Sequence, residues 1–367
     1  MSRLARHYVL IVEHPTSYPV QSRQDIRDLV SDSILVVAPG WVGDTIMMQP
    51  MLTRLAEMHP GVCIDVLVAP EMAELVLRMP EVHATVIMPV GHGKMDLRSR
   101  FRLGRSLVGK YDWAIVLPNS LKSAFIPWFA GIPRRIGYKG EMRWGFLNDM
   151  RNLDPLLLPR MVDRFLFLAD KAEAGQPSHY GFPKLKVSTE QQRKVREQFN
   201  LSSVSAALCI GAEYGPAKRW PVSRFAELAQ KLAGRGYEIF LMGSAKDQQI
   251  ASDILRKSPF CKDLTGLTTL GQAVDILSIC AVAVCNDSGL MHVAAALGLP
   301  LVALYGSSSP GFTPPLSKRA RIISLNLDCS PCFKRDCPFG HLNCLNGITA
   351  AMVEGEIDGL LGSYIED

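Results

Sequence analysis

The chain has 367 residues, of which 48% are apolar and 20% are charged, and its formal net charge is +5. This balance is typical of a globular protein with room for two domains, and it excludes a fibrous or largely disordered chain. No apolar run approaches the roughly 18 residues that a membrane-spanning helix needs. The apolar run 8–12 is too short for a secretory signal, and Glu13 and His14 end it. We therefore expect a cytoplasmic protein.

The first half alternates apolar runs with helical patterns from Ser33 onward, after an N-terminal extension (1–32) that shows no periodicity. Continuous apolar runs separated by helices indicate parallel strands that are covered on both faces. The first strand is followed by a glycine-containing loop and a helix, in which Pro50 predicts a kink or an offset first turn. The strands predicted in this half are 34–38, 64–68, 85–88 and 114–117.

The second half repeats this alternation after a segment that is richer in proline and polar residues. Gly236 lies just past the first helical pattern, where it predicts a helix stop. The predicted strands are 206–210, 238–242, 282–285 and 301–305, and the predicted helices are 222–234, 246–257, 271–280 and 289–297. The pattern indicates an α/β chain with two Rossmann-like domains, mostly parallel sheets, and a site in the cleft that faces the carboxyl ends of the strands.

Two loops of the second half follow buried strands and precede helices. The loop 286–289 carries Asn-Asp-Ser-Gly before an Ala-rich helix, whose unpaired N–H groups and positive dipole end favour a phosphate. His292 lies one turn into that helix, and the loop 211–221 carries Lys218 beside Arg219. Two such loops predict a diphosphate held between them.

Basic residues concentrate between Gly91 and Arg143, a stretch that contains eleven lysines and arginines and three acidic residues. Within this stretch the run 134–144 alternates cations with aromatic residues and glycines, and we interpret it as a loop that suits an anionic lipid headgroup or another polyanion. A nucleic-acid partner is not expected, because the sequence has no RNP-like motif or recognition-helix signature.

Four of the nine cysteines gather near the C-terminus, at Cys329, Cys332, Cys337 and Cys344, with His341 among them. Such a set has the ingredients of a zinc site, although its spacing is shorter than the common finger patterns. The alternative is four reduced thiols on a proline-rich surface loop. The other five cysteines lie in or beside apolar stretches and are interpreted as core residues.

The order and spacing of these loops resemble the ADP-heptose:lipopolysaccharide heptosyltransferases. The resemblance extends over about residues 33–325 and leaves out the extension and the cysteine-rich tail. The segments that carry it are 39–44, 79–82, 89–93, 117–120, 129–133, 211–221, 243–247, 286–297 and 301–316.

The resemblance implies a GT-B fold and inverting, metal-independent transfer of L-glycero-D-manno-heptose from ADP-heptose, with no cofactor. The implied acceptor is the first heptose of the lipopolysaccharide inner core on Kdo2-lipid A, an anionic glycolipid, so a monomeric enzyme in peripheral contact with the cytoplasmic face of the inner membrane is expected. The implied domains are an extension (1–32), an acceptor-binding domain (33–175), a linker (176–200), a donor-binding domain (201–328) and a cysteine-rich loop with a C-terminal helix (329–367).

Asp44 matches the family's catalytic carboxylate, which takes the proton of the acceptor hydroxyl, and Lys218 matches the lysine that stabilises the departing diphosphate. From the residues alone, Asp44 has the alternative role of a helix N-cap, Lys218 that of a solvated cation, and His292 that of a buried core histidine. The donor-binding set is Glu213, Lys218, Met242, Ser244, Asp287, Ser288, Gly289 and His292, and the acceptor-binding set is Lys122, Arg134, Arg135, Lys139 and Arg143.

Some of these assignments stay open. In the segment 243–247 the candidates for the ribose contact are Ser244 and Asp247. Each acceptor cation has the alternative role of a solvated basic residue. Two other functions also remain: a first-step heptosyltransferase or another GT-B nucleotide-sugar enzyme, and a non-catalytic protein that binds a nucleotide sugar or a glycolipid.

Overall fold

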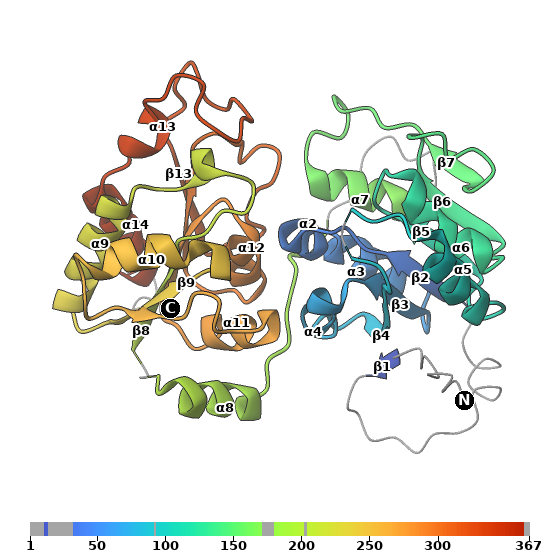
Figure 1. Ribbon diagram of the computed structural model, residues 1–367, viewed down its shortest axis with the longest axis horizontal. Coiled ribbons are helices and arrows are strands. Elements are labelled where there is room, and N and C mark those ends of the chain that lie inside the picture. Colours follow the sequence, from blue (N-terminus) through green and yellow to red (C-terminus); the bar gives the residue numbers. More distant parts are fainter. Residues whose placement is uncertain (1–10, 14–31, 92, 171–179, 202–203, 363–367) are drawn as a thin grey trace, which may run out of the picture. The chain divides into compact units, whose positions relative to one another are not determined.

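The computed structural model describes residues 11–13, 32–91, 93–170, 180–201 and 204–362. It divides into two compact units, unit 1 (Met1–Gly181) and unit 2 (Phe182–Asp367) (Figure 1). Most of the predicted extension (1–32) and the predicted boundary between residues 175 and 176 lie outside the described residues. None of the described helices has the length and apolar character needed to cross a membrane.

Unit 1 contains a seven-stranded sheet in the order β1-β4-β3-β2-β5-β6-β7, in which β1 is antiparallel to β4 and all other neighbours are parallel. From β4 to β7 this is the strand order of a Rossmann fold, since the chain first runs outward on one side of β2 and then on the other. The strands are β1 (Ile11–Glu13), β2 (Ser33–Val37), β3 (Cys63–Val68), β4 (Val82–Ile87), β5 (Trp113–Val116), β6 (Arg134–Tyr138) and β7 (Asp149–Arg151).

Helices cover the unit 1 sheet, and α5 and α6 pack on one face of it through a shared apolar cluster. The helix after β2 is interrupted at Met48, and Pro50 lies in the first turn of its second part, so the predicted offset at this proline is confirmed. The α-helices are α2 (Val42–Met47), α3 (Gln49–Met58), α4 (Ala73–Val76), α5 (Leu97–Ser106), α6 (Phe125–Phe129) and α7 (Met161–Ala169), and the 3₁₀ turns are η1 (Pro70–Met72) and η2 (Leu121–Ala124).

The structure corrects two strand predictions in unit 1. The strand predicted at 85–88 begins three residues earlier, since β4 is Val82–Ile87. The run 134–144 was interpreted as a loop, but its first five residues form β6, which pairs with β5 and β7. Ile136, Gly137 and Tyr138 are buried there, and a Cβ on Gly137 would lie 2.9 Å from Leu147 Cδ1. The strand was missed because two arginines begin it, and the run was interpreted from its charges instead of from the short apolar stretch that follows them.

Unit 2 contains a six-stranded parallel sheet in the order β10-β9-β8-β11-β12-β13, which is again the Rossmann order. The predicted strands 238–242 and 301–305 agree with β9 and β12 at both ends. The predicted strand 206–210 is displaced by one residue from β8, and 282–285 begins with β11 but ends one residue before it. The strands are β8 (Ser205–Cys209), β9 (Glu238–Met242), β10 (Lys262–Asp263), β11 (Val282–Asn286), β12 (Leu301–Tyr305) and β13 (Ala320–Ser324).

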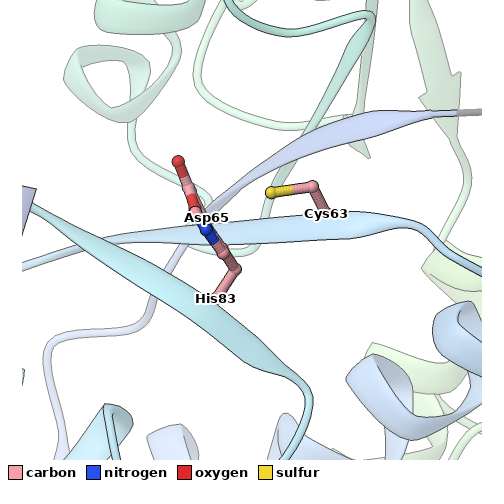
Figure 2. Close-up of side chains that lie close together, drawn as sticks. All are labelled: Cys63, Asp65 and His83. Atoms are coloured by element: carbon pink, nitrogen blue, oxygen red, sulfur yellow. The ribbon is translucent and has the colours of Figure 1, made fainter. Parts of the chain in front are cut away.

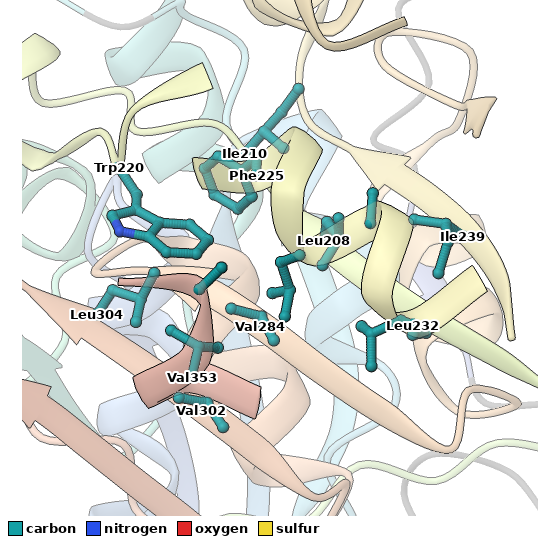
Figure 3. Close-up of a cluster of buried hydrophobic side chains, with 14 of the residues drawn as sticks. Leu208, Ile210, Trp220, Phe225, Leu232, Ile239, Val284, Val302, Leu304 and Val353 are labelled. Atoms are coloured by element: carbon teal, nitrogen blue, oxygen red, sulfur yellow. The ribbon is translucent and has the colours of Figure 1, made fainter. Parts of the chain in front are cut away.

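The core of unit 2 is a continuous apolar cluster between one face of this sheet and three helices, α9, α10 and α14 (Figure 3). Gly236 follows α9 with a φ of 89°, which confirms the predicted helix stop. The α-helices are α8 (Thr189–Phe199), α9 (Val222–Gly234), α10 (Gln248–Leu255), α11 (Leu270–Leu277), α12 (Gly289–Ala296), α13 (Asn343–Asn346) and α14 (Ala350–Gly362), and the 3₁₀ turns are η3 (Pro216–Lys218) and η4 (Ala245–Asp247).

The outer parts of unit 2 extend the Rossmann core. The helix α8, in the range predicted as a linker, packs on α11. The helix α14, in the predicted C-terminal segment, packs on α9 and contributes Val353, Ile357 and Leu360 to the apolar cluster. Both segments are therefore parts of the second compact unit.

Candidate functional site

In unit 2 the strand order reverses between β8 and β11, and the loops that follow these strands meet at the carboxyl edge of the sheet. Such a switch point is the usual ligand-binding place of open α/β sheets. Asn286, at the end of β11 and fully buried, joins the two loops. Its amide nitrogen donates to Ile210 O (2.8 Å), and its Oδ1 accepts from the Trp220 N–H (2.9 Å). The loop 211–221 is thereby fixed to the start of the loop that precedes α12.

Lys218 and Asp287, one from each loop, form an ion pair with Nζ and Oδ2 2.5 Å apart. The lysine side chain is 18% exposed and the aspartate side chain is 5% exposed, so the pair is only partly screened by solvent. An ammonium group has three donors. Lys218 can thus keep its bond to Asp287 and still donate to an anionic ligand.

The helix α12 begins directly after this pair. Ser288 is its N-cap residue, with extended backbone, and within the described part of the chain its side chain makes no capping hydrogen bond. The first N–H groups of α12 and the Ser288 hydroxyl therefore remain to be satisfied by water or a ligand. Ser288 and Gly289 are both half-buried, which leaves this helix end accessible. An eight-residue helix with such an end favours an anion.

His292 faces the same cluster from the first turn of α12. It is 3% exposed, and burial lowers its pKa from the ordinary 6.5 to about 4, with smaller electrostatic effects from Asp287, which raises the pKa, and Lys218, which lowers it. Its imidazole is therefore neutral at physiological pH. Nδ1 is buried and has no hydrogen-bond partner among the residues that the structure describes. We call Lys218, Asp287, Ser288, Gly289 and His292 the candidate donor site.

The other predicted donor residues lie apart from this set or are engaged elsewhere. Glu213 is exposed and forms an ion pair with Lys246. The Met242 side chain is 1% exposed and belongs to the core. Ser244 donates from its hydroxyl (2.8 Å) and its N–H (2.9 Å) to Asp247 Oδ2, so these two candidates for the ribose contact pair with each other.

Sequence reasoning did not single out two buried hydroxyl groups at the carboxyl end of β12. The Oγ atoms of Ser307 and Ser308 lie below the surface, and the described residues offer neither of them a hydrogen-bond partner. The sequence signal that could have pointed to these hydroxyl groups is the run of three serines after Gly306. Their position after β12 places them at the same sheet edge as Asn286.

Unit 1 has its own switch point, between β2 and β5, and Asp44 lies beside it. Trp41, not Asp44, is the N-cap residue of α2, and Asp44 is the third residue of that helix. The alternative role of an N-cap is therefore not the one that the structure shows. Asp44 is half-buried, in the first turn after β2, where the helix dipole stabilises its carboxylate.

Of the five predicted acceptor cations, Arg143 alone is fully buried, and Arg135 is half-buried. Lys139 is exposed at the end of β6, and Lys122 is half-buried in η2. The guanidinium of Arg134 is exposed but donates to Asp149 Oδ2 at 2.7 Å and lies 5.3 Å from the ring centroid of Trp113. Of the five, Lys139 has the most accessible charge.

Arg135 and Arg143 have structural roles in unit 1. Arg143 is fully buried and donates to Pro118 O (2.7 Å), Asn119 Oδ1 (3.2 Å) and Tyr138 O, while burial lowers its pKa. Arg135 donates to the carbonyl groups of Phe146 (2.6 Å) and Ile132, and burial again lowers its pKa. Oxygen atoms of unit 1 thus engage both guanidinium groups. Arg143 is inaccessible to an acceptor, whereas Arg135 keeps partial exposure.

Among the described residues, one group of metal-ligand side chains has its atoms within 4.8 Å of one another: Cys63 and Asp65 on β3 and His83 on β4 (Figure 2). The register shift between β3 and β4 leaves His83 as an extra residue, and Nδ1 lies 2.9 Å from Asp65 Oδ1. The Asp65 hydrogen bond, followed by that of Cys63, raises the pKa of His83 to about 10. The group lies in the amino-terminal halves of its strands, away from Asp44, and is accounted for as an ion pair.

Comparison with known proteins gives consistent results. Residues 100–343 match the model of glycosyltransferase family 9 (heptosyltransferase). Lipopolysaccharide heptosyltransferase 2 of Escherichia coli K12 is 46% identical over 89% of this chain and 98% of its own length. Lipopolysaccharide heptosyltransferase 1 of Pseudomonas aeruginosa PAO1 is 26% identical over 83% of this chain and 87% of its own length. The solved structure of E. coli ADP-heptose lps heptosyltransferase II covers 90% of this chain and 99% of its own, with 44% identity and a TM-score of 0.81.

Proposed function

The chain belongs to glycosyltransferase family 9, and on that premise we propose that it transfers L-glycero-D-manno-heptose from ADP-heptose to the first heptose of the lipopolysaccharide inner core. The identity of 46% with a heptosyltransferase 2, against 26% with a heptosyltransferase 1, favours the second transfer step over the first. Membership of a glycosyltransferase family also sets aside the non-catalytic binding protein.

The observation that carries the proposal is the candidate donor site. In it a partly buried lysine and an uncapped helix end lie beside the buried His292, whose Nδ1 has no hydrogen-bond partner in the described chain. Negative charge develops on the diphosphate as ADP leaves. Lys218 and the N–H groups of α12 are placed to stabilise that charge, and neutral His292 can donate to a phosphate oxygen. In this scheme the transfer step requires no divalent metal ion.

Asp44 takes the role of general base in this scheme. The acceptor hydroxyl attacks C1 of the donor heptose from the face opposite ADP, its proton passes to the Asp44 carboxylate, and the bond from C1 to the diphosphate oxygen breaks. Inversion at C1 follows from the single displacement. The half-buried position of Asp44 leaves its carboxylate partly accessible, as contact with an acceptor hydroxyl requires.

The surface of α5 and α6 supports a peripheral contact with an anionic membrane that carries the acceptor. Phe101, Phe129, Trp128 and Phe146 form a continuous aromatic strip, with successive ring centroids 5.1, 5.0 and 5.1 Å apart. Phe101 and Trp128 are exposed, as are the arginines on α5 nearby, Arg98, Arg102 and Arg105. Aromatic rings that enter the headgroup region beside cations are typical of interfacial binding.

The test is a transfer assay with ADP-heptose, EDTA and two acceptors, one with the first heptose on Kdo2-lipid A and one without heptose. Product from the mono-heptosylated acceptor alone is the expected result. Product from the heptose-free acceptor would reassign the chain to the first step, and transfer from UDP- or GDP-sugars in preference to ADP-heptose would assign it to another GT-B reaction. Dependence on added Mg²⁺ or Mn²⁺ would overturn the metal-independent scheme.

A further inference from the structure

The four C-terminal cysteines, Cys329, Cys332, Cys337 and Cys344, are all free and half-buried, and we call them the cysteine cluster. All four line one cavity together with Ala217, Ser307 and His341. The volume of this cavity is about 10 Å³. Such a cavity holds one water-sized guest and no organic ligand.

The histidine of this loop is engaged within the loop itself. The Nδ1 of His341 accepts from the Asn343 N–H at 3.0 Å, and its ring stacks on Phe339. Cysteine is therefore the main ligand type among the residues that line the cavity. In the described chain no three of the four sulfur atoms lie within 4.8 Å of one another, so a bound metal ion has to draw them inward.

We propose that the cysteine cluster binds one Zn²⁺ ion in a tetrahedral, four-thiolate structural site. Four sulfur ligands and no open position are characteristic of structural zinc, and soft thiolates select zinc or iron over magnesium and calcium. On binding, the four thiols release their protons and the sulfur atoms draw in from the cavity wall to about 2.3 Å from the metal. No electron transfer accompanies this step.

The same loop contacts the segment that carries Lys218. Arg335 O accepts from the Ala217 N–H (2.9 Å), Arg335 Nε donates to Tyr214 O (2.7 Å), and the Tyr214 hydroxyl donates to Phe333 O (2.8 Å). The fit is close, because a Cβ on Gly215 would lie 2.5 Å from Arg335 O. The Lys218 ammonium in turn lies 5.2 Å from the ring centroid of Tyr214. We call the loop 211–221 the donor loop. The zinc site therefore holds the donor loop in place without contacting the donor, an effect that rests on the proposed function.

The first experiment is metal analysis of the purified full-length chain by inductively coupled plasma mass spectrometry. We expect about one equivalent of zinc that dialysis against EDTA leaves bound and a mercurial thiol reagent releases. A Co²⁺-substituted sample should show the charge-transfer and d–d absorption of a tetrahedral thiolate site. Absence of bound metal, with four thiols that react freely in the native protein, would overturn the proposal, and so would iron in place of zinc.

Variants identify the ligands. Cys332→Ser and Cys337→Ser should each lower the bound zinc to below about 0.2 equivalents. Cys63→Ser is the matched control, because Cys63 belongs to the metal-ligand group of unit 1 (Figure 2), and it should retain the full equivalent. Loss of zinc in Cys63→Ser but not in Cys332→Ser would move the metal to unit 1 and refute the assignment. Loss of the metal in His341→Ala would replace the four-thiolate site with a mixed one and also refute it.

Metal content is measured without any substrate, so this result is independent of the proposed transfer reaction. The kinetic consequence is a second readout, in which Cys332→Ser should raise the KM for ADP-heptose and leave the KM for the acceptor unchanged. Circular dichroism checks that the variant is folded. If zinc binds but the KM for ADP-heptose stays constant in a folded Cys332→Ser variant, the effect on the donor loop is refuted.

Discussion

The two switch points of this protein have the same strand order but differ in how their polar groups are connected. In unit 2 a buried asparagine, Asn286, and the Lys218–Asp287 pair connect the loops after β8 and β11. In unit 1, Asp44 is half-buried, and Trp41, three residues before it, is 49% exposed. Trp144, elsewhere in the same unit, is 58% exposed. One Rossmann framework thus supports the cross-linked loops of the candidate donor site in one unit and an open, amphipathic surface in the other.

The largest expected effect is on kcat, and it tests the proposed role of Asp44 in unit 1. Asp44→Asn should lower kcat about a thousandfold, because the amide cannot accept the acceptor proton, while ADP binding changes by less than about twofold. Steady-state kinetics and calorimetric titration with ADP measure the two quantities. Glu57→Gln, which changes an exposed carboxylate in the same unit, is the control. A kcat within tenfold of the parent would remove Asp44 as the base.

Two histidines, one in each unit, have shifted pKa values, so the pH dependence of the free energy of unfolding tests the two units separately. His292, with a pKa of about 4 when folded, gains a proton only in the unfolded chain between pH 6.5 and 4. The free energy of unfolding should therefore fall as the pH drops through this window, by on the order of 3 kcal/mol, and His292→Gln should remove this fall. Denaturant unfolding from pH 4 to 7 measures it, and parallel curves for parent and variant would contradict the assignment.

His83 provides the opposite case for the same experiment. Its folded pKa of about 10 means that its contribution to stability is complete below pH 6.5 and is lost as the pH rises toward 10. His83→Gln should therefore change the pH dependence on the alkaline side and leave the acidic side as in the parent. A change confined to the acidic side would show that the Asp65 ion pair does not hold the proton.

Lys218→Ala tests the candidate donor site directly. Removal of the ammonium group leaves the diphosphate without its cation and Asp287 without its partner, so the Kd for ADP should rise about 10- to 100-fold. Calorimetric titration measures this change. Lys257→Ala, at an exposed position in the same unit, should leave it unaltered. An unchanged Kd in Lys218→Ala would place the diphosphate elsewhere.

The smallest effect belongs to the open surface of unit 1. Lys139→Ala should raise the KM for the glycolipid acceptor about threefold, since an exposed cation contributes less than about 1 kcal/mol. The difference should shrink at high salt, because the charge is screened. Kinetics at two ionic strengths measure it. An effect of more than tenfold would show that Lys139 lies in a desolvated site instead of on an open surface.

The sequence predicts the alternation of strands and helices well, and it predicts side-chain partners poorly. The strand 238–242, the helix 222–234 and the stop at Gly236 follow from apolar runs and a left-handed glycine, which are local signals. The partner of Lys218 lies 69 residues away, and nothing near it in the sequence indicates that partner. Arg143 shows the same limit, since its position in a basic run predicted an accessible cation. Only the tertiary structure shows that it is buried and donates to three carbonyl-type oxygen atoms.

The placement of Trp220 has a spectroscopic consequence. It is the single tryptophan between residues 182 and 367, and it is 1% exposed at the end of the loop that carries Lys218. Its N–H donates to Asn286, its indole Nε1 donates to Ile348 O (3.0 Å), and its ring meets Phe225 edge to face at 4.9 Å. Its fluorescence therefore samples the donor loop, the switch point and the C-terminal segment at once. With the four other tryptophans replaced by phenylalanine, the emission of this one indole would report nucleotide binding in unit 2 alone.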